Sequence, residues 1–294
     1  MSADVTIVEV GPRDGLQNEP RPIPTPEKIA LVDALSSAGF ARIEAASFVS
    51  PRWVPQMADG TAVMAGIMRR PGTRYAALTP NMRGFEAALA AGVDEVAIFG
   101  AASETFSARN INASIAESLA RFAPLAEAAA AHGMPMRAYV SCAVHCPYEG
   151  AIEPEAVAEV AAQMDALGAY EVSLGDTTGQ GTPETVAAML DAVRAAVPAG
   201  RLAGHFHDTN GRALESVDVA LTAGLRVFDA AIGGLGGCPY APGAAGNLAT
   251  EWLVAHLEAG GYATGIDRAA LAAAGAQAKA IREGKAIREG KDAP

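Results

Sequence analysis

The sequence has few cysteines and no recognisable export signal. Only 3 of the 294 residues are cysteines, Cys142, Cys146 and Cys238, which is an odd number without CxxC spacing. This excludes a disulfide framework and a thiolate zinc site, and it is typical of a reducing compartment. The opening MSADVTIVEV passes at once into a strand-like run, with no basic segment, apolar stretch and cleavage site before it. We therefore expect an intracellular protein without a signal peptide.

Long apolar runs and an excess of positive charge are also absent. Polar or charged residues interrupt every Ala-rich stretch before the roughly 18 apolar residues that suggest a transmembrane helix, so no membrane partner is expected. The chain has 22 Lys and Arg against 33 Asp and Glu, a formal net charge of −11, which makes nucleic acid an unsuitable partner. The charge does not exclude small anionic ligands, because a few arginines in a cleft can reverse the local potential.

What the sequence does contain is an alternation of short apolar runs with longer Ala-rich amphipathic stretches, continuing to about position 260. This alternation is typical of βαβ units. The helical stretches 27–38, 82–91, 111–132, 155–167 and 212–223 each end at a glycine, the usual residue just after a helix. The expected strands are 5–10, 41–47, 73–79, 95–101, 136–142, 171–176, 202–207 and 227–232.

Eight strands alternating with helices predict an α/β fold, the closed (β/α)8 or TIM barrel, with additional C-terminal helices at 247–259 and 267–285. A doubly wound open sheet is the alternative, but no GxGxxG follows the first strand. We expect a single catalytic domain over residues 1–294. Its last part, 280–294, in which AIREGK occurs twice in succession, is expected to be a loosely ordered tail.

In a barrel of this kind, catalytic groups lie where strands end and the following loops begin. Each candidate here also has a plainer interpretation: a turn for Arg13-Asp14, a core pair for the histidines, an Asx turn for Asp176 and an inert thiol for Cys238. The glycine-rich segment 233–246 is either disordered or a mobile loop, with Gly236 and Gly237 beside Cys238. The candidates at five strand ends are Arg13 and Asp14, Glu44, Asp176, His205 and His207, and Cys238 with Asn247.

Two features of these residues indicate chemistry. His205 and His207 stand at positions i and i+2 of one strand, so their imidazoles point to the same face. Together with Asp14 and Asn247 they offer a mixed nitrogen and oxygen ligand set, which suits a six-coordinate divalent ion with two positions left for substrate. Imidazole favours Mn²⁺, Co²⁺ or Zn²⁺ over Mg²⁺, and the sequence leaves the metal open. Glu44, inside an apolar strand, needs a buried partner, for which Arg13 is the candidate.

The order of the motifs resembles one known family. GPRDGLQNE, IEAASFVSPRWVPQMAD, LTPN, IFGAASE, NINASI, YVSCAVHCPYEG, SLGDTTGQGTP, HFHDTNG and GGLGGCPYAPGAAGNLATE follow one another as in the 3-hydroxy-3-methylglutaryl-CoA lyases. The resemblance covers roughly residues 4–279. The long GGCPYAPGAAGN block separates these lyases from related synthases that act on isopropylmalate or homocitrate. One departure is Phe206, where cysteine is frequent in the family, but its side chain should point away from the ion.

The resemblance implies cleavage of 3-hydroxy-3-methylglutaryl-CoA to acetyl-CoA and acetoacetate with Mg²⁺ or Mn²⁺ bound. It also implies a place in leucine catabolism and ketone body formation, a homo-oligomer, most simply a dimer, and an acyl-CoA as the partner. Because the targeting leader and C-terminal cysteine of animal members are missing, the cytoplasm of a bacterium is the expected location. By position, the implied metal ligands are Asp14, His205, His207 and Asn247; the substrate-binding residues Arg13, Gln17, Ser173 and Thr177; and the catalytic residues Arg13, Cys238, Asp176, Glu44 and His205.

The mechanism that we expect has one open point. The metal would lower the pKa of the substrate's tertiary alcohol, and a base would remove its proton; Asp176, His205 and Asp14 are the candidates. Arg13 would stabilise the enolate oxygen, and Cys238 would protonate the enolate carbon. The alternatives are the same cleavage of a longer 3-hydroxy-3-substituted glutaryl-CoA, an acetyl-CoA-dependent condensing synthase, or a non-enzymatic metal- or CoA-binding scaffold.

Overall fold

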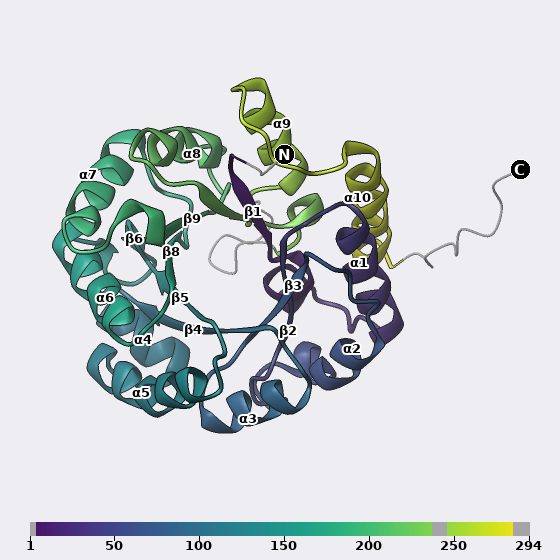
Figure 1. The fold of residues 1–294 in the computed structure, drawn as a ribbon. Coiled ribbons are helices and arrows are strands. Elements are labelled where there is room, and N and C mark those ends of the chain that lie inside the picture. The colour runs from purple at the N-terminus through teal and green to yellow at the C-terminus, as the bar shows by residue number, and fades with distance from the viewer. Residues whose placement is uncertain (1–3, 237–245, 285–294) are drawn as a thin grey trace, which may run out of the picture.

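A ring of parallel strands forms the centre of the molecule in the computed structural model, which describes residues 4–236 and 246–284. In spatial order the strands run β1-β10-β9-β8-β5-β4-β3-β2 and close into a barrel, since β1 pairs with both β2 and β10 (Figure 1). The prediction of a (β/α)8 barrel is therefore confirmed. The barrel strands are β1 (Thr6–Glu9), β2 (Arg42–Ser47), β3 (Arg74–Leu78), β4 (Glu95–Ala101), β5 (Met136–Ser141), β8 (Glu171–Asp176), β9 (Leu202–Phe206) and β10 (Val227–Ala230).

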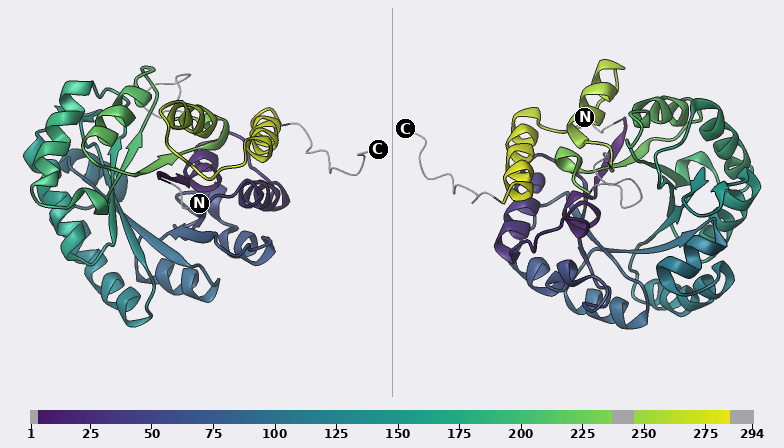
Figure 2. Two further views of the ribbon diagram at one scale, coloured as in Figure 1. Left: turned by 45° about the horizontal axis from the view of Figure 1, so that its top comes forward. Right: turned by 180° about the vertical axis from the view of Figure 1, so that it is seen from behind.

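Helices surround the barrel (Figures 1 and 2), and their buried apolar residues form one core cluster with those of the strands. The glycines after α1 and α6 fit this arrangement, because Gly39 and Gly168 have φ angles of 93° and 95°, which only glycine adopts without strain. The helices are α1 (Thr25–Ser37), α2 (Gly60–Gly66), α3 (Met82–Ala90), α4 (Glu104–Ile111), α5 (Ile115–Ala131), α6 (Pro154–Ala166), α7 (Pro183–Arg194), α8 (Ala213–Thr222), α9 (Thr250–Ala259) and α10 (Arg268–Arg282).

The expected helix over 111–132 was wrong at its start. The chain instead forms α4 and then α5, because Asn112 adopts a left-handed conformation with φ of 50° that ends the first helix. Ser114 then starts the second helix with a capping box, in which its side chain and that of Glu117 bond each other's backbone amides. Two further elements carry no pattern that predicts them from the sequence: α2 and the short hairpin of β6 (His145–Cys146) and β7 (Gly150–Ala151).

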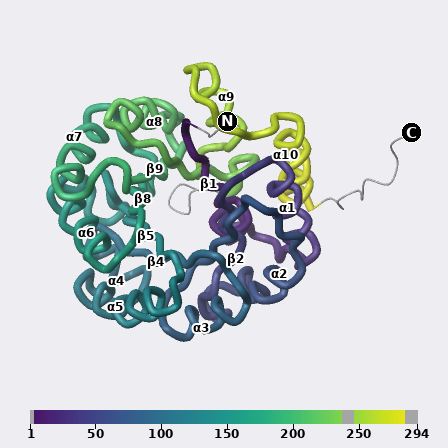
Figure 3. Tube along the Cα trace, viewed as in Figure 1, coloured from purple at the N-terminus to yellow at the C-terminus, as the bar shows by residue number. Residues whose placement is uncertain are grey.

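The two C-terminal helices are present, and α10 lies beside α1, so the two ends of the described chain meet (Figures 1 and 3). The Arg21 guanidinium donates two hydrogen bonds to the carbonyl of Ile281, and the Asp267 amide donates to the carbonyl of Ala38. Ile281 is fully buried. The predicted tail therefore begins too early at 280, since α10 continues to Arg282; residues 285–294 lie outside the described residues.

Charged side chains form a network inside the barrel, near the starts of the strands. Arg137 donates from Nε to Glu171 at 2.6 Å, and Arg42 pairs with the same carboxylate at 3.0 Å. Glu95 accepts from Arg42, Arg74 and Tyr170. Because unpaired charges are costly in a dry interior, this network fixes the side chains to one another. The barrel is consequently filled by polar groups below the site as well as by apolar ones.

Candidate active site

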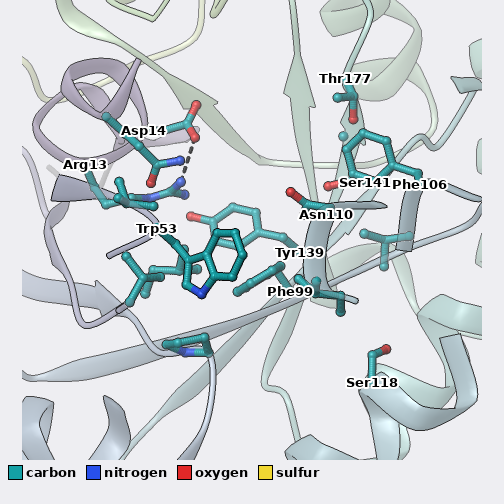
Figure 4. A pocket seen from close by; sticks show the side chains of 18 of the residues that line it. Arg13, Asp14, Trp53, Phe99, Phe106, Asn110, Ser118, Tyr139, Ser141 and Thr177 are labelled. Atoms are coloured by element: carbon teal, nitrogen blue, oxygen red, sulfur yellow. Dashed lines mark hydrogen bonds and ion pairs between the residues drawn. The ribbon is translucent and has the colours of Figure 1, made fainter. Parts of the chain in front are cut away.

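A cavity of about 700 Å³ opens at the carboxyl ends of the barrel strands. Its polar side carries Arg13, Asp14, His205 and His207, and its apolar side carries Val49, Leu78, Phe99 and Phe122. Figure 4 shows Arg13 and Asp14 from one element facing Tyr139 and Asn110 from others. Since loops vary while strands stay fixed, this end of a barrel is where catalytic groups gather.

A short π-helix directly after β1, η1 (Gly11–Gly15), presents the first two predicted site residues. The Val10 carbonyl accepts hydrogen bonds from the amides of Arg13, Asp14 and Gly15, the shortest being 2.7 Å from Asp14. Three successive amides therefore converge on one carbonyl at the barrel mouth. π-Helical turns are rare and occur often at functional sites.

Arg13 is held between two carboxylates. Its Nε atom donates to Glu44 at 2.6 Å and its Nη1 atom to Asp14 at 2.6 Å, so the predicted partnership of Arg13 and Glu44 is confirmed. Burial acts to lower the pKa of Arg13, but the charges of Glu44 and Asp14 outweigh it and raise the pKa. Burial likewise acts to raise the pKa of Asp14, yet the Arg13 charge lowers it to about 2. Both side chains are thus charged at neutral pH.

The two histidines converge with Asp14. Their ring centres are 5.3 Å apart, and one ligand atom each from Asp14, His205 and His207 lies within 4.8 Å of the others. Burial and the neighbouring His205 lower the pKa of His207 to about 4, so its imidazole is neutral. The Nδ1 atom of His207 is buried without a hydrogen-bond partner among the described residues. Such a convergent, neutral-nitrogen and carboxylate set is able to hold a divalent cation.

Asn247 joins this cluster from the other end of the chain. Its Nδ2 atom donates to Asp14 at 2.8 Å and to the carbonyl of Leu235 at 3.2 Å. Its backbone forms an antiparallel bridge with His207. All four predicted metal ligands are therefore brought together, and their nitrogen and oxygen donors fit the predicted ion.

The predicted substrate-binding residues Gln17, Ser173 and Thr177 also line the cavity. The Oε1 atom of Gln17 is buried without a partner among the described residues. The Ser173 hydroxyl donates to Asp229 at 2.7 Å, and the Thr177 hydroxyl accepts from the Cys142 amide at 2.9 Å. Gln17 is thus left with free hydrogen-bonding capacity for a ligand, whereas the two hydroxyls already have protein partners.

Asp176 is placed differently from the expectation for a base. Its carboxylate accepts from the amides of Gln180 at 3.2 Å and Gly181 at 2.7 Å, and the side chain is not among the residues that line the cavity. The carboxylate therefore holds the loop after β8 through backbone amides four and five residues further along the chain. Asp176 stays a candidate base together with His205 and Asp14.

The predicted thiol Cys238 and the loop residue Gly237 lie outside the described residues. Gly236 is described, and its carbonyl accepts from the Asn247 amide at 3.3 Å. At the other end, the Gly246 carbonyl accepts from the Asp208 amide at 2.7 Å. Both ends of the segment therefore lie beside the metal-ligand candidates.

Several residues that line the cavity were not singled out from the sequence. Tyr139 lies on β5, under the Arg13 guanidinium at 5.5 Å. Arg109 on α4 and Arg121 on α5 approach from the helices, and Trp53 is 87% exposed at the cavity edge. No local pattern marks these four residues, because their position depends on how the loops fold back. Asp229, described below, did have a signal: it is an acidic residue inside an apolar predicted strand.

Comparison with known proteins identifies the family. A model of the HMGL-like family matches residues 4–277. The chain belongs to this family. It is 55% identical over 277 residues to the 3-hydroxy-3-isohexenylglutaryl-CoA/hydroxy-methylglutaryl-CoA lyase of Pseudomonas aeruginosa, covering 94% of this chain and 92% of that one. It is 56% identical over 271 residues to the mitochondrial hydroxymethylglutaryl-CoA lyase of Homo sapiens, covering 92% and 83%.

Solved structures agree with this assignment. The HMG-CoA lyase from Brucella melitensis has a TM-score of 0.95 at 58% identity, over 96% of this chain and 100% of that one. An HMG-CoA lyase from Acinetobacter baumannii in complex with coenzyme A and 3-methylmalate has a TM-score of 0.90 at 38% identity, over 100% and 99%. The predicted resemblance and the prediction that the chain is a lyase are confirmed. No helix in the described part is long and apolar enough to cross a membrane.

Proposed function

We propose that this protein cleaves 3-hydroxy-3-methylglutaryl-CoA to acetyl-CoA and acetoacetate, using a divalent metal. The observation that carries the proposal is the convergence of Asp14, His205 and His207 within 4.8 Å, with Arg13 paired to Asp14, at the wall of one large cavity. The names of the relatives, with identities of 55% to 58% over at least 90% of this chain, give the reaction class and the substrate.

Asp14, His205, His207 and Asn247 would hold the metal, for which Mg²⁺ and Mn²⁺ are the proposed ions. When bound, such an ion acts as a Lewis acid that lowers the pKa of a substrate hydroxyl. The low pKa of Asp14 keeps its carboxylate ionised, and the low pKa of His207 keeps its ring neutral, as ligands must be. The buried Nδ1 atom of His207, which has no partner in the described part, supports the same assignment.

Residues of this chain would then act as the base, stabilise the enolate and return a proton to it. Asp14 or Asp176 accepts the proton of the tertiary alcohol, because a His205 ring that holds the metal through one nitrogen and carries hydrogen on the other has no lone pair left. The bond between the second and third acyl carbons breaks, and acetoacetate forms with the enolate of acetyl-CoA. Arg13, oriented by Glu44 at 2.6 Å, stabilises the enolate oxygen. Cys238 gives a proton to the enolate carbon. The last role rests on the resemblance.

Binding of an anionic acyl-CoA by a chain of net charge −11 requires local positive charge. Arg109 and Arg121, which line the cavity together with Arg13, would supply it. Gln17, Ser173 and Thr177 are proposed to contact the acyl part. The structure of the A. baumannii relative in complex with coenzyme A supports a CoA-linked substrate.

A second candidate substrate has one specific observation in its favour. The P. aeruginosa relative is named for 3-hydroxy-3-isohexenylglutaryl-CoA as well as for the methyl compound. Four apolar side chains, Val49, Leu78, Phe99 and Phe122, form one side of the cavity here. A longer apolar substituent on the third carbon would be stabilised there by burial.

We also propose a cytoplasmic location, a homodimer, and a place in leucine catabolism and ketone body formation. Relatives differ in location: the one from Danio rerio is named cytoplasmic and the one from Gallus gallus mitochondrial. The bacterial relative from P. aeruginosa supports the cytoplasm. Light scattering of the purified protein tests the dimer.

The deciding experiment is a product assay with purified protein and 3-hydroxy-3-methylglutaryl-CoA, in Mg²⁺, in Mn²⁺ and in chelator. We expect acetyl-CoA and acetoacetate in equal amounts, with formation abolished by the chelator. No turnover by folded, metal-loaded protein would contradict the proposed substrate, and the isohexenyl compound would then be assayed with the same readout.

A further inference from the structure

Asp229 on β10 lies directly beside His205 on β9. The two residues are register partners on neighbouring parallel strands, and Asp229 Oδ2 is 3.1 Å from His205 Nδ1. The Asp229 side chain is fully buried, and it is not among the residues that line the cavity. Any effect that it has on a ligand in the cavity must therefore pass through the two cavity-lining residues that it contacts, His205 and Ser173; of these, only His205 belongs to the cluster of metal-ligand candidates.

The Asp229 carboxylate is saturated by donors. Arg137 donates hydrogen bonds to both of its oxygens, from Nη2 to Oδ1 at 2.7 Å and from Nη1 to Oδ2 at 3.1 Å. The Ser173 hydroxyl donates to Oδ2 at 2.7 Å. Arg137 is itself fixed by a second carboxylate, since its Nε atom donates to Glu171 at 2.6 Å. Asp229 therefore has one well-defined position, set from three strands.

This arrangement constrains the histidine. A carboxylate bound to a guanidinium accepts hydrogen bonds and has none to give, so His205 Nδ1 must carry the hydrogen. The lone pair of a neutral His205 ring is then on Nε2, the nitrogen that remains for the cluster with Asp14 and His207. His207 differs, because no carboxylate is hydrogen-bonded to its Nδ1 atom in the described part of the chain.

We propose that Asp229 is a positioning residue that holds His205 as the Nδ1–H tautomer and directs its Nε2 atom to the metal. This inference rests on the proposed role of His205 as a metal ligand. Partners of this kind fix the orientation of a ligating ring and raise its basicity, and their loss commonly weakens metal binding by about 10-fold to 100-fold.

Two variants separate positioning from general stabilisation. Asp229→Asn keeps the size of the side chain but removes the charged acceptor from His205 and Arg137. Glu171→Gln removes the negative charge that accepts from the Nε atom of Arg137, away from His205, and serves as the matched control. Circular dichroism and thermal melting first establish that both variants are folded. Titration of each metal-free protein with Mn²⁺, followed by the electron paramagnetic resonance of free Mn²⁺, then gives the affinity.

We expect Asp229→Asn to weaken Mn²⁺ binding by about 10-fold to 100-fold and Glu171→Gln to change it less than about 3-fold. Equal affinity in Asp229→Asn and the wild type would overturn the positioning role, as would equal weakening in both variants. A wild-type protein that binds no Mn²⁺, Mg²⁺ or Zn²⁺ would instead contradict the proposed metal function together with this inference.

A second measurement needs neither the metal nor the Asp229 variant. Nitrogen-15 NMR of the metal-free wild type distinguishes the two imidazole tautomers, and a His205→Gln sample assigns the signal among the 5 histidines. The proposal requires Nδ1–H at His205 at a pH where the ring is neutral. Finding the hydrogen on Nε2 would overturn it even if Asp229→Asn failed to fold.

Discussion

At the scale of the single residue, the site depends on charges that are paired inside a poorly solvated interior. Asp14 is the clearest case, because burial acts to raise its pKa and the opposing influences, of which the charge of Arg13 is the largest, together outweigh burial. Removing one member of such a pair leaves the other charge without compensation, which is more damaging than loss of a surface pair. Substitutions here should therefore alter ligand binding and also lower stability, so a folding measurement belongs beside each binding measurement.

The first prediction concerns Asp14→Asn. The variant keeps the shape of the side chain but loses the anionic ligand that is held by Arg13 and Asn247. We expect Mn²⁺ affinity to fall by at least about 100-fold and lyase activity to fall with it, because a ligand is lost rather than a supporting contact. Isothermal titration calorimetry with Mn²⁺ measures the affinity, and the product assay measures the activity. Tightly bound metal at full occupancy in the variant would refute the ligand set.

The second prediction separates chemistry from metal binding. Cys238→Ser should slow turnover strongly, by about 100-fold or more, because a serine hydroxyl is a much weaker acid than a thiol. Metal affinity should stay unchanged, because none of the four ligand candidates is altered. Steady-state kinetics and a Mn²⁺ titration on the same preparation measure both. If metal binding is lost together with activity, the assignment of Cys238 as proton donor is wrong.

At the scale of the element, close backbone contacts hold the site-bearing segments together. The π-helix η1 touches the segment that precedes Asn247: a Cβ atom built on Gly236 would lie 3.0 Å from both Gly15 Cα and Asn247 Nδ2. Gly236 also has a φ angle of 87°. A side chain at this position would have to push apart the two elements that carry Asp14 and Asn247.

The third prediction is that Gly236→Ala weakens Mn²⁺ binding, by about 10-fold or more if the displacement acts as the loss of a supporting contact does. Gly72→Ala is the matched control, since Gly72 has the same φ of 87° but no atom within 4 Å of a built Cβ. Backbone strain of about 1–3 kcal/mol should destabilise both variants. Chemical denaturation and metal titration are the measurements, and normal Mn²⁺ affinity in Gly236→Ala would show that the contact is dispensable.

At the scale of the whole molecule, one buried carboxylate links the first strand to the end of the chain. Glu9 on β1 accepts from the amides of Gly11 at 2.8 Å and Ile232 at 2.9 Å, and from the Thr250 hydroxyl at 2.7 Å. Burial is the largest influence and raises the pKa of Glu9 from 4.5 to about 8, against these hydrogen bonds. The folded state consequently holds a proton that the unfolded state has lost at neutral pH.

The fourth prediction follows from that difference. Because the folded pKa is the higher one, the stabilisation from Glu9 is complete below pH 4.5 and is lost as the pH rises to about 8. Each pH unit in this range is worth up to about 1.4 kcal/mol of unfolding free energy. Glu9→Gln should remove this slope, so the difference between wild type and variant, measured by urea unfolding from pH 5 to 8, isolates it. Parallel pH profiles would contradict the shift.

The architecture of this protein follows from local patterns in its sequence. Apolar runs and the glycines at the helix ends predicted the positions of all eight barrel strands. This was possible because the spacing of apolar residues and the capping of helices are local properties of the sequence. The prediction failed at 111–132, where a left-handed Asn112 divides the helix, since one residue's backbone conformation leaves little trace in composition. At the site, the position of Asp14, His205, His207 and Asn247 after predicted strands made them candidates, because parallel strands bring their carboxyl ends to one edge.

The contacts of each of these side chains depend instead on the folded barrel. In the folded protein, the Asp176 carboxylate accepts a hydrogen bond from its own loop. Arg13 pairs with Asp14 and Glu44, and Asp229 contacts the Nδ1 atom of His205. The physical reason is that hydrogen bonds and charges act over a few ångströms and depend on direction. Residues far apart in the sequence meet at such distances only after the barrel has closed, whereas the apolar pattern that closes it is already complete in the chain.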